Sequence, residues 1–432
     1  MNDVAKRINP DWQAAQQRLD SFLREKRNAG KEGRSLTEGL EPRARELVSG
    51  VLRHRTRLES FWQDHVKKPP KGRLRVFMLL ALWDAVRGDR TQSMAQVVDH
   101  AVSQIALHCS PREKNFANAV LRKAAPQARA EWTLKKIPKG SDWPVYFSHP
   151  ASLVQRWRKT FGTEATAKLL AWNNTPGQNF LRWRDPLSPP PETFVPTPWD
   201  GFYHLPDLPW PEIRVLLDSG KAYIQDPATR GVREFLDSFS GTRFLDACAA
   251  PGGKTLLVAD TLDLHHRKDF QFVAMDKEGP RLMRLQENLQ NAGLGQTIHL
   301  FSGNLGYPLV PQLHKAGLPP TFDAILLDVP CSNTGVFRRR PEARWHWSEK
   351  ALASLAGQQL EFLQNAASAI TPSGLLLYST CSLEEEENQG VVDHFLNSPV
   401  GRGFMLEKSR LYLPWIDGHD GAGLFALRQL SK

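Results

Sequence analysis

The class of fold follows from residues 244–255, Phe244-Leu245-Asp246-Ala247-Cys248-Ala249-Ala250-Pro251-Gly252-Gly253-Lys254-Thr255. This stretch begins as a short apolar strand, passes through a glycine turn and ends at the start of a helix. Glycines at such a turn let a ligand approach the backbone, and the first N–H groups of the helix are free to bind it. The spacing is neither that of a G-x-G-x-x-G fingerprint nor that of a phosphate loop. The stretch therefore predicts a ligand-binding turn without naming the ligand.

Strands and helices alternate after this turn. Short apolar runs predict strands at residues 270–275, 298–300, 324–327 and 375–378. The segments at residues 254–260, 280–291 and 351–370 have helical length and periodicity. This alternation predicts an α/β domain with a doubly wound, mostly parallel, Rossmann-like sheet.

The chain before this domain has a different pattern. Residues 10–123 are expected to be helical, with breaks at Pro69-Pro70 and Gly88-Asp89-Arg90 and a last helix from Ser110-Pro111 to about Arg122. A polar connection at residues 135–140 predicts a domain boundary. Residues 145–235 combine several kinds of element. A helix is expected at 152–161, a strand at 180–183 and a proline-rich loop from Pro186 to Pro198, and two apolar runs follow at 215–217 and 222–224.

Length and composition limit the class of protein. With 432 residues the chain is too long for one hydrophobic core, so two or three domains are expected. The 41% hydrophobic and 24% charged residues are typical of a soluble protein, and neither a membrane span nor a signal peptide is expected. Four cysteines without C-x-x-C spacing argue against a zinc ribbon and a disulfide framework, and they favour a reducing cytoplasm.

The positive charge is concentrated in the first third of the chain. Residues 1–130 contain 25 Lys and Arg against 14 Asp and Glu, a net charge of +11, whereas the whole chain carries +10. The remaining residues therefore have a net charge of −1. A basic helical module joined to a neutral α/β module indicates an enzyme that binds a polyanion. A surface that is charged for solubility is the alternative.

Two cysteines are expected to meet at one edge of the sheet. Cys331 and Cys381 each follow a predicted buried strand, in Asp328-Val329-Pro330-Cys331 and Ser379-Thr380-Cys381. Ligands bind in the crevice at the carboxyl ends of parallel strands. Two thiols there could supply a nucleophile, a redox pair or metal ligands. No His, Asp or Glu cluster has metal-ligand spacing, so no metal is expected, and the ligand-binding turn favours a nucleophile.

Carboxylates near these thiols narrow the chemistry. Asp328 precedes Cys331, and Asp276 ends the second strand, where an acid either binds the ribose of a nucleoside cofactor or caps the next helix. A thiolate that adds to C6 of cytosine makes C5 nucleophilic, an acid can hold the N3 proton, and a second thiol can assist release. The set fits methyl transfer to a pyrimidine. Cys248 and Cys109 are expected to be packed small hydrophobic residues.

Three motifs resemble those of the RNA 5-methylcytosine methyltransferase family. They lie at residues 246–255, at residues 328–335 and at Ser379-Thr380-Cys381-Ser382 with Glu387-Asn388, in the order found in the family. Residues 43–53 and 115–122 are similar to the NusB-like helical domain of the subgroup that acts on bacterial 16S ribosomal RNA. The resemblance implies three domains, which are a NusB-like RNA-binding domain at residues 1–138, an α+β RNA-recognition subdomain at 145–235 and a Rossmann-like catalytic domain at 236–432.

The resemblance also implies a cofactor and a substrate. The cofactor is S-adenosylmethionine, and the substrate is a cytosine of 16S ribosomal RNA, free or in an assembling small subunit. Cys381 is the implied nucleophile, Cys331 aids breakdown of the covalent adduct, and Asp328 and Lys254 complete the catalytic set. DNA cytosine methyltransferases use the cysteine of the Pro-Cys motif as nucleophile and would give the opposite assignment. The implied cofactor-binding residues are Ala247, Cys248, Ala249, Ala250, Pro251, Gly252, Gly253, Lys254, Asp276, Asn304 and Asp328.

Basic residues near the Cys331 loop are candidates for RNA contact. A guanidinium group beside an indole ring suits phosphate contact and base stacking, and a solvated basic loop is the alternative. The chain departs from the family pattern at Asn304, where Asp is usual, at Arg184, where Asn is usual, and in residues 417–425. Glu384–Glu387 is expected to be the charged start of the last helix. The candidates for RNA contact are Arg338, Arg339, Arg340, Arg344 and Arg182.

Other functions stay open. An enzyme of this kind could act on tRNA or DNA, and the chain could instead be a catalytically silent RNA-binding factor in ribosome assembly or antitermination. The presence of all four catalytic residues favours an active enzyme. A monomer is the default expectation, although the sequence leaves the oligomeric state open.

Overall fold

The chain forms two compact units. The computed structural model describes residues 8–24, 36–88, 91–133, 137–185, 188–237, 239–264, 266–267 and 269–431. Unit 1 comprises residues 1–175 and 337–347, and unit 2 comprises residues 176–336 and 348–432. The division near residue 175 differs from the boundary that the sequence predicts at residues 135–140, and the three domains that the family resemblance implies stay a prediction. Asp89-Arg90, Lys135-Lys136 and Pro186, expected in turns and connections, lie outside the described residues.

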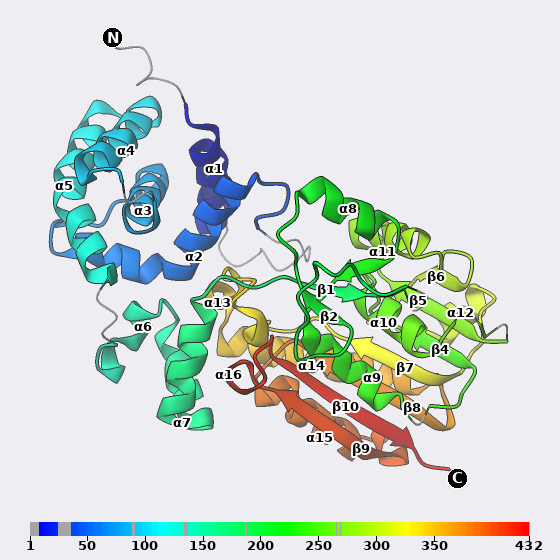
Figure 1. Ribbon diagram of the computed structural model, residues 1–432. Helices are drawn as coiled ribbons and strands as arrows, with labels where there is room; N and C mark the ends of the chain where they lie inside the picture. Colours follow the sequence, from blue (N-terminus) through cyan, green and yellow to red (C-terminus); the bar gives the residue numbers. More distant parts are fainter. Residues whose placement is uncertain are drawn as a thin grey trace. The chain divides into compact units, whose positions relative to one another are not determined.

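Unit 1 is helical, as the periodicity predicts (Figure 1). The last predicted helix of residues 10–123 continues beyond Arg122 to Thr133, because its alanine-rich end favours a helix. The helix expected at 152–161 is present and continues past a break at Gly162, where φ is 81°. The helices are α1 (Pro10–Arg24), α2 (Pro42–Gln63), α3 (Gly72–Arg87), α4 (Met94–His108), α5 (Pro111–Thr133), α6 (Trp143–Tyr146), α7 (Ala151–Asn173) and α13 (Ala343–His346).

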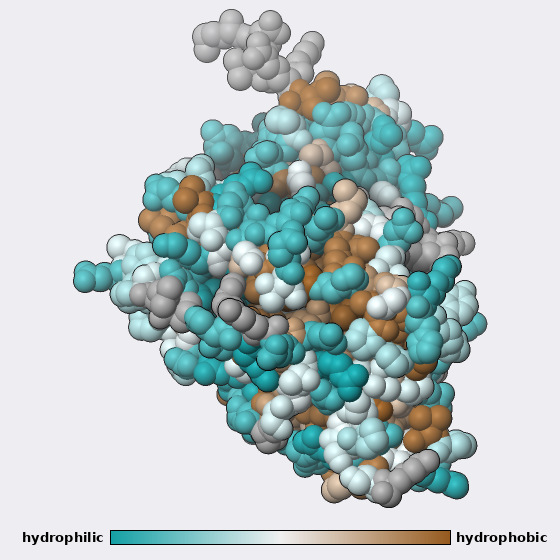
Figure 2. All heavy atoms as spheres, turned by 90° about the vertical axis from the view of Figure 1, so that its right-hand side faces the viewer, coloured by the Kyte–Doolittle hydropathy of each residue, from teal (hydrophilic) through white to brown (hydrophobic). Residues whose placement is uncertain are grey.

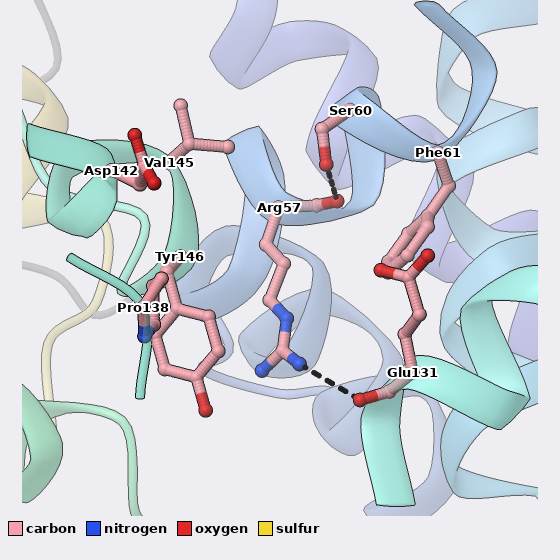
Figure 3. Close-up of a pocket in the computed structure, with 8 residues that line it drawn as sticks. All are labelled: Arg57, Ser60, Phe61, Glu131, Pro138, Asp142, Val145 and Tyr146. Carbon is pink, nitrogen blue, oxygen red and sulfur yellow. Dashed lines mark hydrogen bonds between the residues drawn. The ribbon is translucent and has the colours of Figure 1, made fainter. Parts of the chain in front are cut away.

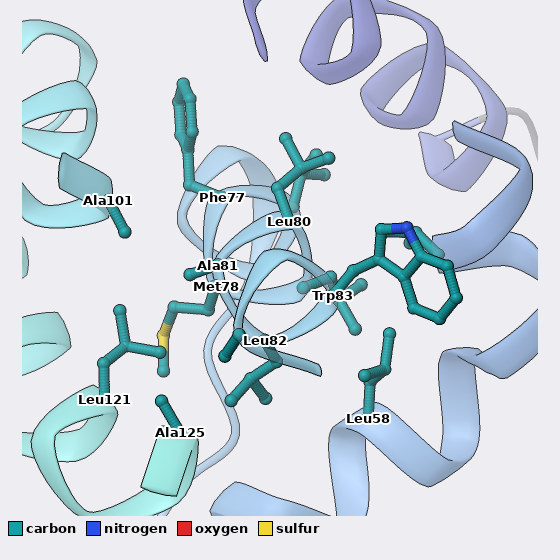
Figure 4. Close-up of a cluster of buried hydrophobic side chains, with 14 of the residues drawn as sticks. Leu58, Phe77, Met78, Leu80, Ala81, Leu82, Trp83, Ala101, Leu121 and Ala125 are labelled. Carbon is teal, nitrogen blue, oxygen red and sulfur yellow. The ribbon is translucent and has the colours of Figure 1, made fainter. Parts of the chain in front are cut away.

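Helix α3 is the centre of this unit. Its side chains from Leu74 to Val86 are buried on all sides, apart from Arg75 and Asp84. A helix that is apolar all round needs neighbours all round. Figure 4 shows Phe77, Leu80 and Trp83 pointing away from α3 in different directions. They pack against side chains of α1, α2, α4 and α5, which form one hydrophobic core with α3.

The segment Phe337–Trp347 is also part of unit 1, although the chain belongs to unit 2 on both sides of it. The guanidinium group of Arg344 in this segment is completely buried. It donates hydrogen bonds to the carbonyl oxygens of Arg53, Ser148 and Asn173, at 3.0 to 3.3 Å, and to the side-chain oxygen of Asn174 at 3.0 Å. One arginine therefore joins α13 to α2 and to both ends of α7.

Unit 2 contains a seven-stranded sheet in the order β6-β5-β4-β7-β8-β10-β9. The first five strands in this order are parallel, whereas β10 is antiparallel to both of its neighbours. The five predicted strands and the mostly parallel sheet are confirmed, but the sequence prediction omitted β9 and β10. The strands are β4 (Arg243–Asp246), β5 (Gln271–Asp276), β6 (Ile298–Ser302), β7 (Phe322–Asp328), β8 (Ile370–Thr380), β9 (Phe404–Tyr412) and β10 (Ala422–Gln429).

Helices cover both faces of this sheet (Figure 1). Alternate residues of each strand point to opposite faces, so Phe244 and Leu245 enter different hydrophobic clusters. One face packs against α9 (Gly231–Phe235), α10 (Gly253–Thr261) and α11 (Pro280–Asn291). The other packs against α12 (Leu309–Lys315), α14 (Glu349–Ala367) and α15 (Gln389–Asn397). The remaining helix after β9 is the single turn α16 (Pro414–Asp417).

A small antiparallel sheet precedes the large one in unit 2. Its order is β2-β1-β3, with β1 (Phe180–Trp183), β2 (Phe202–His204) and β3 (Ala222–Ile224), and α8 (Trp210–Asp218) lies between β2 and β3 in sequence. The sequence predicts the strand at 180–183, and the apolar run at 222–224 forms β3. In the view of Figure 2 the surface is mostly hydrophilic, with scattered hydrophobic groups, as in most folded domains. No described helix has both the length and the apolar character that a bilayer span requires.

Replacement of Arg344 tests the role of this residue in unit 1. We expect Arg344→Leu to lower the free energy of unfolding by about 3 kcal/mol, because the buried oxygens lose a charged donor. Urea unfolding followed by tryptophan fluorescence measures the change. Arg112→Leu, at an exposed position of α5, is the matched control and should stay within about 0.5 kcal/mol of the parent protein. Equal stabilities of the two variants would contradict this role.

Candidate active site

The predicted ligand-binding turn joins β4 to α10. Gly252, directly before α10, has a φ of 111°, which a residue with a side chain rarely adopts. The carboxylate of Asp276, at the end of β5, accepts a hydrogen bond from the backbone N–H of Ala250 at 2.9 Å. It also accepts one from the N–H of Lys277 at 2.7 Å. Asp276 therefore lies against the turn and holds its backbone in place, while its predicted contact with a ribose stays a prediction.

A pocket of about 250 Å³ opens beside this turn. Small ligands commonly occupy pockets of roughly 300 Å³ or more, so the volume of this pocket is slightly below that range. The turn, the end of β7 and the segment after β3 contribute to its wall. Sequence reasoning missed this last segment, because nothing in its composition marks it as part of a site. The lining residues are Tyr223, Ile224, Gln225, Asp226, Thr229, Cys248, Ala249, Ala250, Pro251, Gly253, Lys254 and Asp328.

A buried carboxyl group lies behind the turn. Asp246, the last residue of β4, is 1% exposed, and burial raises its pKa to about 7. One oxygen accepts a hydrogen bond from the hydroxyl of Thr255 at 2.7 Å, whereas Oδ1 is buried without a partner. A buried oxygen without a donor is costly. Together with the small residues of the turn, it fits a ligand that brings a hydrogen-bond donor, such as the amino group of S-adenosylmethionine.

Asn304 follows Gly303, whose N–H binds the carbonyl oxygen of Asp276, but the side chain of Asn304 forms its hydrogen bond within its own loop. Its side-chain oxygen accepts a hydrogen bond from the N–H of Gly306 at 2.9 Å. Gln312 holds the same residue from the other side, because it binds both the N–H and the carbonyl oxygen of Asn304 at 3.0 Å. An amide can shape this loop without the charge of the usual Asp.

Lys254 and Asp328 form an ion pair at the edge of the sheet. The ammonium nitrogen of Lys254 lies 2.7 Å from Oδ1 of Asp328. Burial lowers the pKa of Lys254, whereas the charges of Asp328 and Cys381 and the hydrogen bond to Asp328 raise it. The raising effects are larger in sum, so the net shift is upward. The ammonium group of Lys254 is therefore charged beside the carboxylate of Asp328.

The two predicted thiols touch each other. The sulfur atoms of Cys331 and Cys381 are 3.1 Å apart, both cysteines are free, and the backbone N–H of Cys381 donates to the sulfur of Cys331 at 3.3 Å. The thiol of Cys381 also donates to the side-chain oxygen of Asn333 at 3.2 Å. Four causes raise the pKa of Cys331, namely the hydrogen bond to Cys381, burial, the charge of Cys381 and the charge of Glu387.

These contacts bring together the four predicted catalytic residues. Cys248 is half-buried against the turn, and burial raises its pKa, so it is a poor nucleophile. Among the described residues, no group of three or more His, Cys, Asp and Glu side chains could hold a metal ion. Glu387, which the sequence prediction places in a charged helix start, is instead fully buried. Its position next to the Thr-Cys-Ser motif was the one available sign of a role.

The arginines expected to contact RNA are largely committed to protein partners. Arg182 is 5% exposed and donates to Gln225 at 2.7 Å and to Asp260. Arg184, the departure from the family pattern, binds both oxygens of Asp260 at 2.8 and 2.9 Å. This pair of arginines ties β1 to α10, so the burial of Arg182 argues against its predicted RNA contact.

The arginines after the Cys331 loop lie in unit 1. The buried carbonyl contacts of Arg344 argue against its predicted RNA contact too. Arg338 is 7% exposed and its guanidinium group lies 4.2 Å from the ring of Trp172. Arg339 and Arg340 are only partly buried, and Arg340 lies 3.5 Å from Glu342. RNA contact by Arg339 and Arg340 stays a prediction.

A second pocket, of about 360 Å³, lies in unit 1 (Figure 3). Arg57 is its central side chain, and the close-up shows this residue between Tyr146 and Glu131. Its guanidinium carbon is 4.2 Å from the ring of Trp132 and 4.3 Å from that of Tyr146. Two rings therefore hold the cation by cation–π contact. None of the predicted catalytic residues lines this pocket, whereas Lys254 and Asp328 line the first one, so the first pocket is the better candidate for the catalytic site.

Comparison with known proteins assigns the family. Residues 234–402 match the family model of the 16S rRNA methyltransferase RsmB/F, and residues 5–126 match that of the NusB family. The ribosomal RNA small subunit methyltransferase B of Vibrio cholerae is 31% identical over 407 residues, which are 90% of this chain and 88% of that protein. The protein of the same name from Salmonella paratyphi B is 30% identical over 410 residues, 90% of each chain.

Solved structures agree on the fold. The crystal structure of PH0851 has a TM-score of 0.74 at 20% identity and covers 98% of this chain and 99% of its own. The structure of NSun6 from Pyrococcus horikoshii with SFG has a TM-score of 0.54 at 19% identity, over 66% of this chain and 99% of its own. The two family models match the helical amino-terminal region, at residues 5–126, and the region of the large sheet, at residues 234–402. The chain therefore belongs to the RsmB/F family of S-adenosylmethionine-dependent ribosomal RNA methyltransferases, with a helical region of the NusB family.

Proposed function

We propose that this protein methylates C5 of a cytosine in 16S ribosomal RNA through a covalent bond between Cys381 and C6. The observation that carries this proposal is the contact of two free thiols, 3.1 Å apart, at the carboxyl ends of β7 and β8. The ammonium group of Lys254 and the carboxylate of Asp328 lie beside them. Methyl transfer to an oxygen or an exocyclic nitrogen needs no thiol, whereas covalent activation of a pyrimidine needs one thiol for attack and can use a second one for release.

S-adenosylmethionine is the proposed methyl donor, and it supplies the methyl group when bound. The pocket beside Gly252 supports this assignment, as do the orphaned oxygen of Asp246 and the carboxylate of Asp276. Asp276 is assigned to the ribose, residues 249–254 to the methionine end and Asn304 to the adenine side. The structure of NSun6 with SFG, a related fold, is consistent with this use of the pocket.

Cys381 is the proposed nucleophile. The hydrogen bond to Cys381, burial and the charge of Glu387 raise the pKa of Cys331 and favour a neutral thiol at Cys331. When the sulfur–C6 bond forms, the C5=C6 electron pair shifts toward N3 of the ring. The proton that leaves the thiol of Cys381 is taken up at N3, and Asp328 is assigned to share it. N3 gives this proton up to solvent once C5 has received the methyl group, so the complete reaction releases one proton. The contact of Cys331 with Cys381 and the charge of Glu387 support the same order of roles as the family resemblance.

Cys331 is the proposed partner in release. The C5–H bond breaks, its electrons form the C5=C6 double bond, and the C6–sulfur bond breaks with its electron pair leaving on Cys381. The sulfur of Cys381 then takes the proton of Cys331, and the C5 proton replaces it on Cys331. Both thiols are restored, and the short distance between their sulfur atoms supports such a relay.

The ribosomal target rests on the relatives. Proteins named ribosomal RNA small subunit methyltransferase B match nearly the whole chain, which favours 16S ribosomal RNA over tRNA or DNA. The basic amino-terminal region supports binding to a large RNA. Bisulfite sequencing of ribosomal RNA from cells with and without the gene tests the target. Unchanged 16S ribosomal RNA, with a loss of methylation in tRNA, would overturn this assignment.

Asp276 tests the cofactor pocket. We expect Asp276→Ala to weaken binding of S-adenosylmethionine by about 10- to 100-fold, because a hydrogen-bonded charged group leaves both the ribose site and the turn. Isothermal titration calorimetry with S-adenosylmethionine measures the affinity. The exposed Asp218→Ala on α8 is the control and should bind as tightly as the parent protein. Equal affinities for both variants would contradict the assignment.

Replacement of each of the two cysteines is expected to have the opposite effect on the covalent adduct. We expect Cys381→Ser to lower methylation by roughly 10⁴-fold or more and to form no covalent RNA adduct, because it lacks the nucleophile. Cys331→Ser should form the adduct and accumulate it, because release is blocked. Denaturing gels with radiolabelled 16S ribosomal RNA detect the adduct, and Cys109→Ser in unit 1 is the control for a harmless thiol loss. An adduct in Cys381→Ser but not in Cys331→Ser would reverse the roles.

A further inference from the structure

A buried polar cluster holds the backbone on both sides of Cys331. Gln359 on α14 donates from its amide to the carbonyl oxygen of Pro330 at 2.8 Å. The carboxylate of Glu387 accepts a hydrogen bond from the backbone N–H of Ser332 at 2.8 Å and another from its hydroxyl group. The residue before Cys331 and the residue after it are therefore each fixed by a side chain from another element.

The members of this cluster also bind one another. The amide of Gln359 donates to Glu387 at 3.1 Å, and the hydroxyl of Tyr378 on β8 binds the side-chain oxygen of Gln359 at 3.1 Å and the carbonyl oxygen of Glu387 at 2.6 Å. We call Gln359, Tyr378 and Glu387 the Cys331 clamp. All three are 0 to 1% exposed. A buried network of this kind is stable only when its members are satisfied, and it then fixes a single geometry.

Glu387 is the member of the clamp whose burial costs the most free energy, because its carboxyl group can carry a charge. Burial of its carboxyl group raises its pKa, and the hydrogen bonds from Ser332, Ser382 and Gln359 oppose that shift. A glutamine could accept the same bond from the Ser332 N–H without a charge. The neighbouring Glu385 and Glu386 are exposed, so the position in the turn does not by itself require burial. The negative charge of Glu387 is therefore not required by packing or by the hydrogen bond to Ser332.

The clamp places a negative charge beside one of the two thiols. The charge of Glu387 is one of the causes that raise the pKa of Cys331. A negative charge disfavours a thiolate. The hydrogen bonds of Glu387 and Gln359 to the residues on either side of Cys331 hold this thiol 3.1 Å from the sulfur of Cys381.

We propose that Glu387 is a positioning residue that holds Cys331 as a neutral thiol against the sulfur of Cys381, so that Cys331 serves release of the methylated base and not attack on it. This inference rests on the proposed function, because it assigns a cause to the different roles of the two thiols. It adds a residue that contacts neither the RNA nor the cofactor and acts through the Cys331 loop.

Separate measurements of attack and release test the proposal. Single-turnover reactions with 16S ribosomal RNA and radiolabelled S-adenosylmethionine give methyl transfer, and denaturing gels give the amount of covalent adduct with time. In Glu387→Ala we expect one round of methyl transfer followed by an adduct that decays about 100-fold more slowly than in the parent protein. Glu387→Gln, which keeps the hydrogen bond to Ser332 but not the charge, should show a smaller delay. The matched control Glu385→Gln, in the same turn, should release RNA at the parent rate.

The outcomes separate this inference from the proposed function. Loss of both methyl transfer and adduct formation in soluble, folded Glu387→Gln would overturn the inference. A residue that acts only on release would leave attack and methyl transfer intact. Release at the parent rate in both Glu387 variants would also overturn it. Cys331→Ser is run in parallel. If Cys331→Ser accumulates the adduct and the Glu387 variants do not, the inference fails while the proposed function holds. If Cys331→Ser forms no lasting adduct, the proposed function itself fails.

Discussion

The parallel pairing of β7 with β8 is the constraint on which the site depends. Their register sets Asp328 opposite Ser379, so the two chains leave the sheet at the same level. The Pro-Cys and Thr-Cys segments then run side by side, and two cysteines 50 residues apart in sequence reach contact. The pairing of β4 with β7 adds the cofactor turn to the same edge. A slip of one residue between β7 and β8 would turn alternate side chains to the other face and separate the thiols.

The parts of the site that strong local signals mark could be predicted from the sequence. Apolar runs gave the five parallel strands, and the glycine turn gave the start of α10 and the position of Gly252. The convergence of Cys331 and Cys381 followed because polar groups at the ends of parallel strands share one crevice. β9 escaped prediction because it is an edge strand whose residues from Glu407 to Leu411 are exposed, so it lacks the apolar run of a central strand.

Charged residues were the least predictable, because a sequence does not say where a charge is neutralised. Glu387 directly follows the exposed Glu385 and Glu386 in sequence. It is nevertheless enclosed by Ser332, Tyr378 and Gln359, which come from other elements of the fold. Arg182 and Arg344 were expected at RNA for the same reason. Their partners, Asp260 and a set of backbone carbonyl oxygens, are known only once the fold has brought them together. Long-range pairing therefore decides between a structural and a functional arginine.

The membership of residues 337–347 in unit 1 has a consequence for how the protein is made. Residues 337–347 are synthesised after β7 and the Cys331 loop, yet they supply Arg344 and Trp345 to the helical unit. The amino-terminal helices therefore emerge from the ribosome nearly two hundred residues before their last contacts exist. Domains generally fold as units during synthesis, in the order in which they emerge. Here the helical unit must wait in an incomplete state until half of the catalytic sheet has been translated, so the two units mature together instead of one after the other.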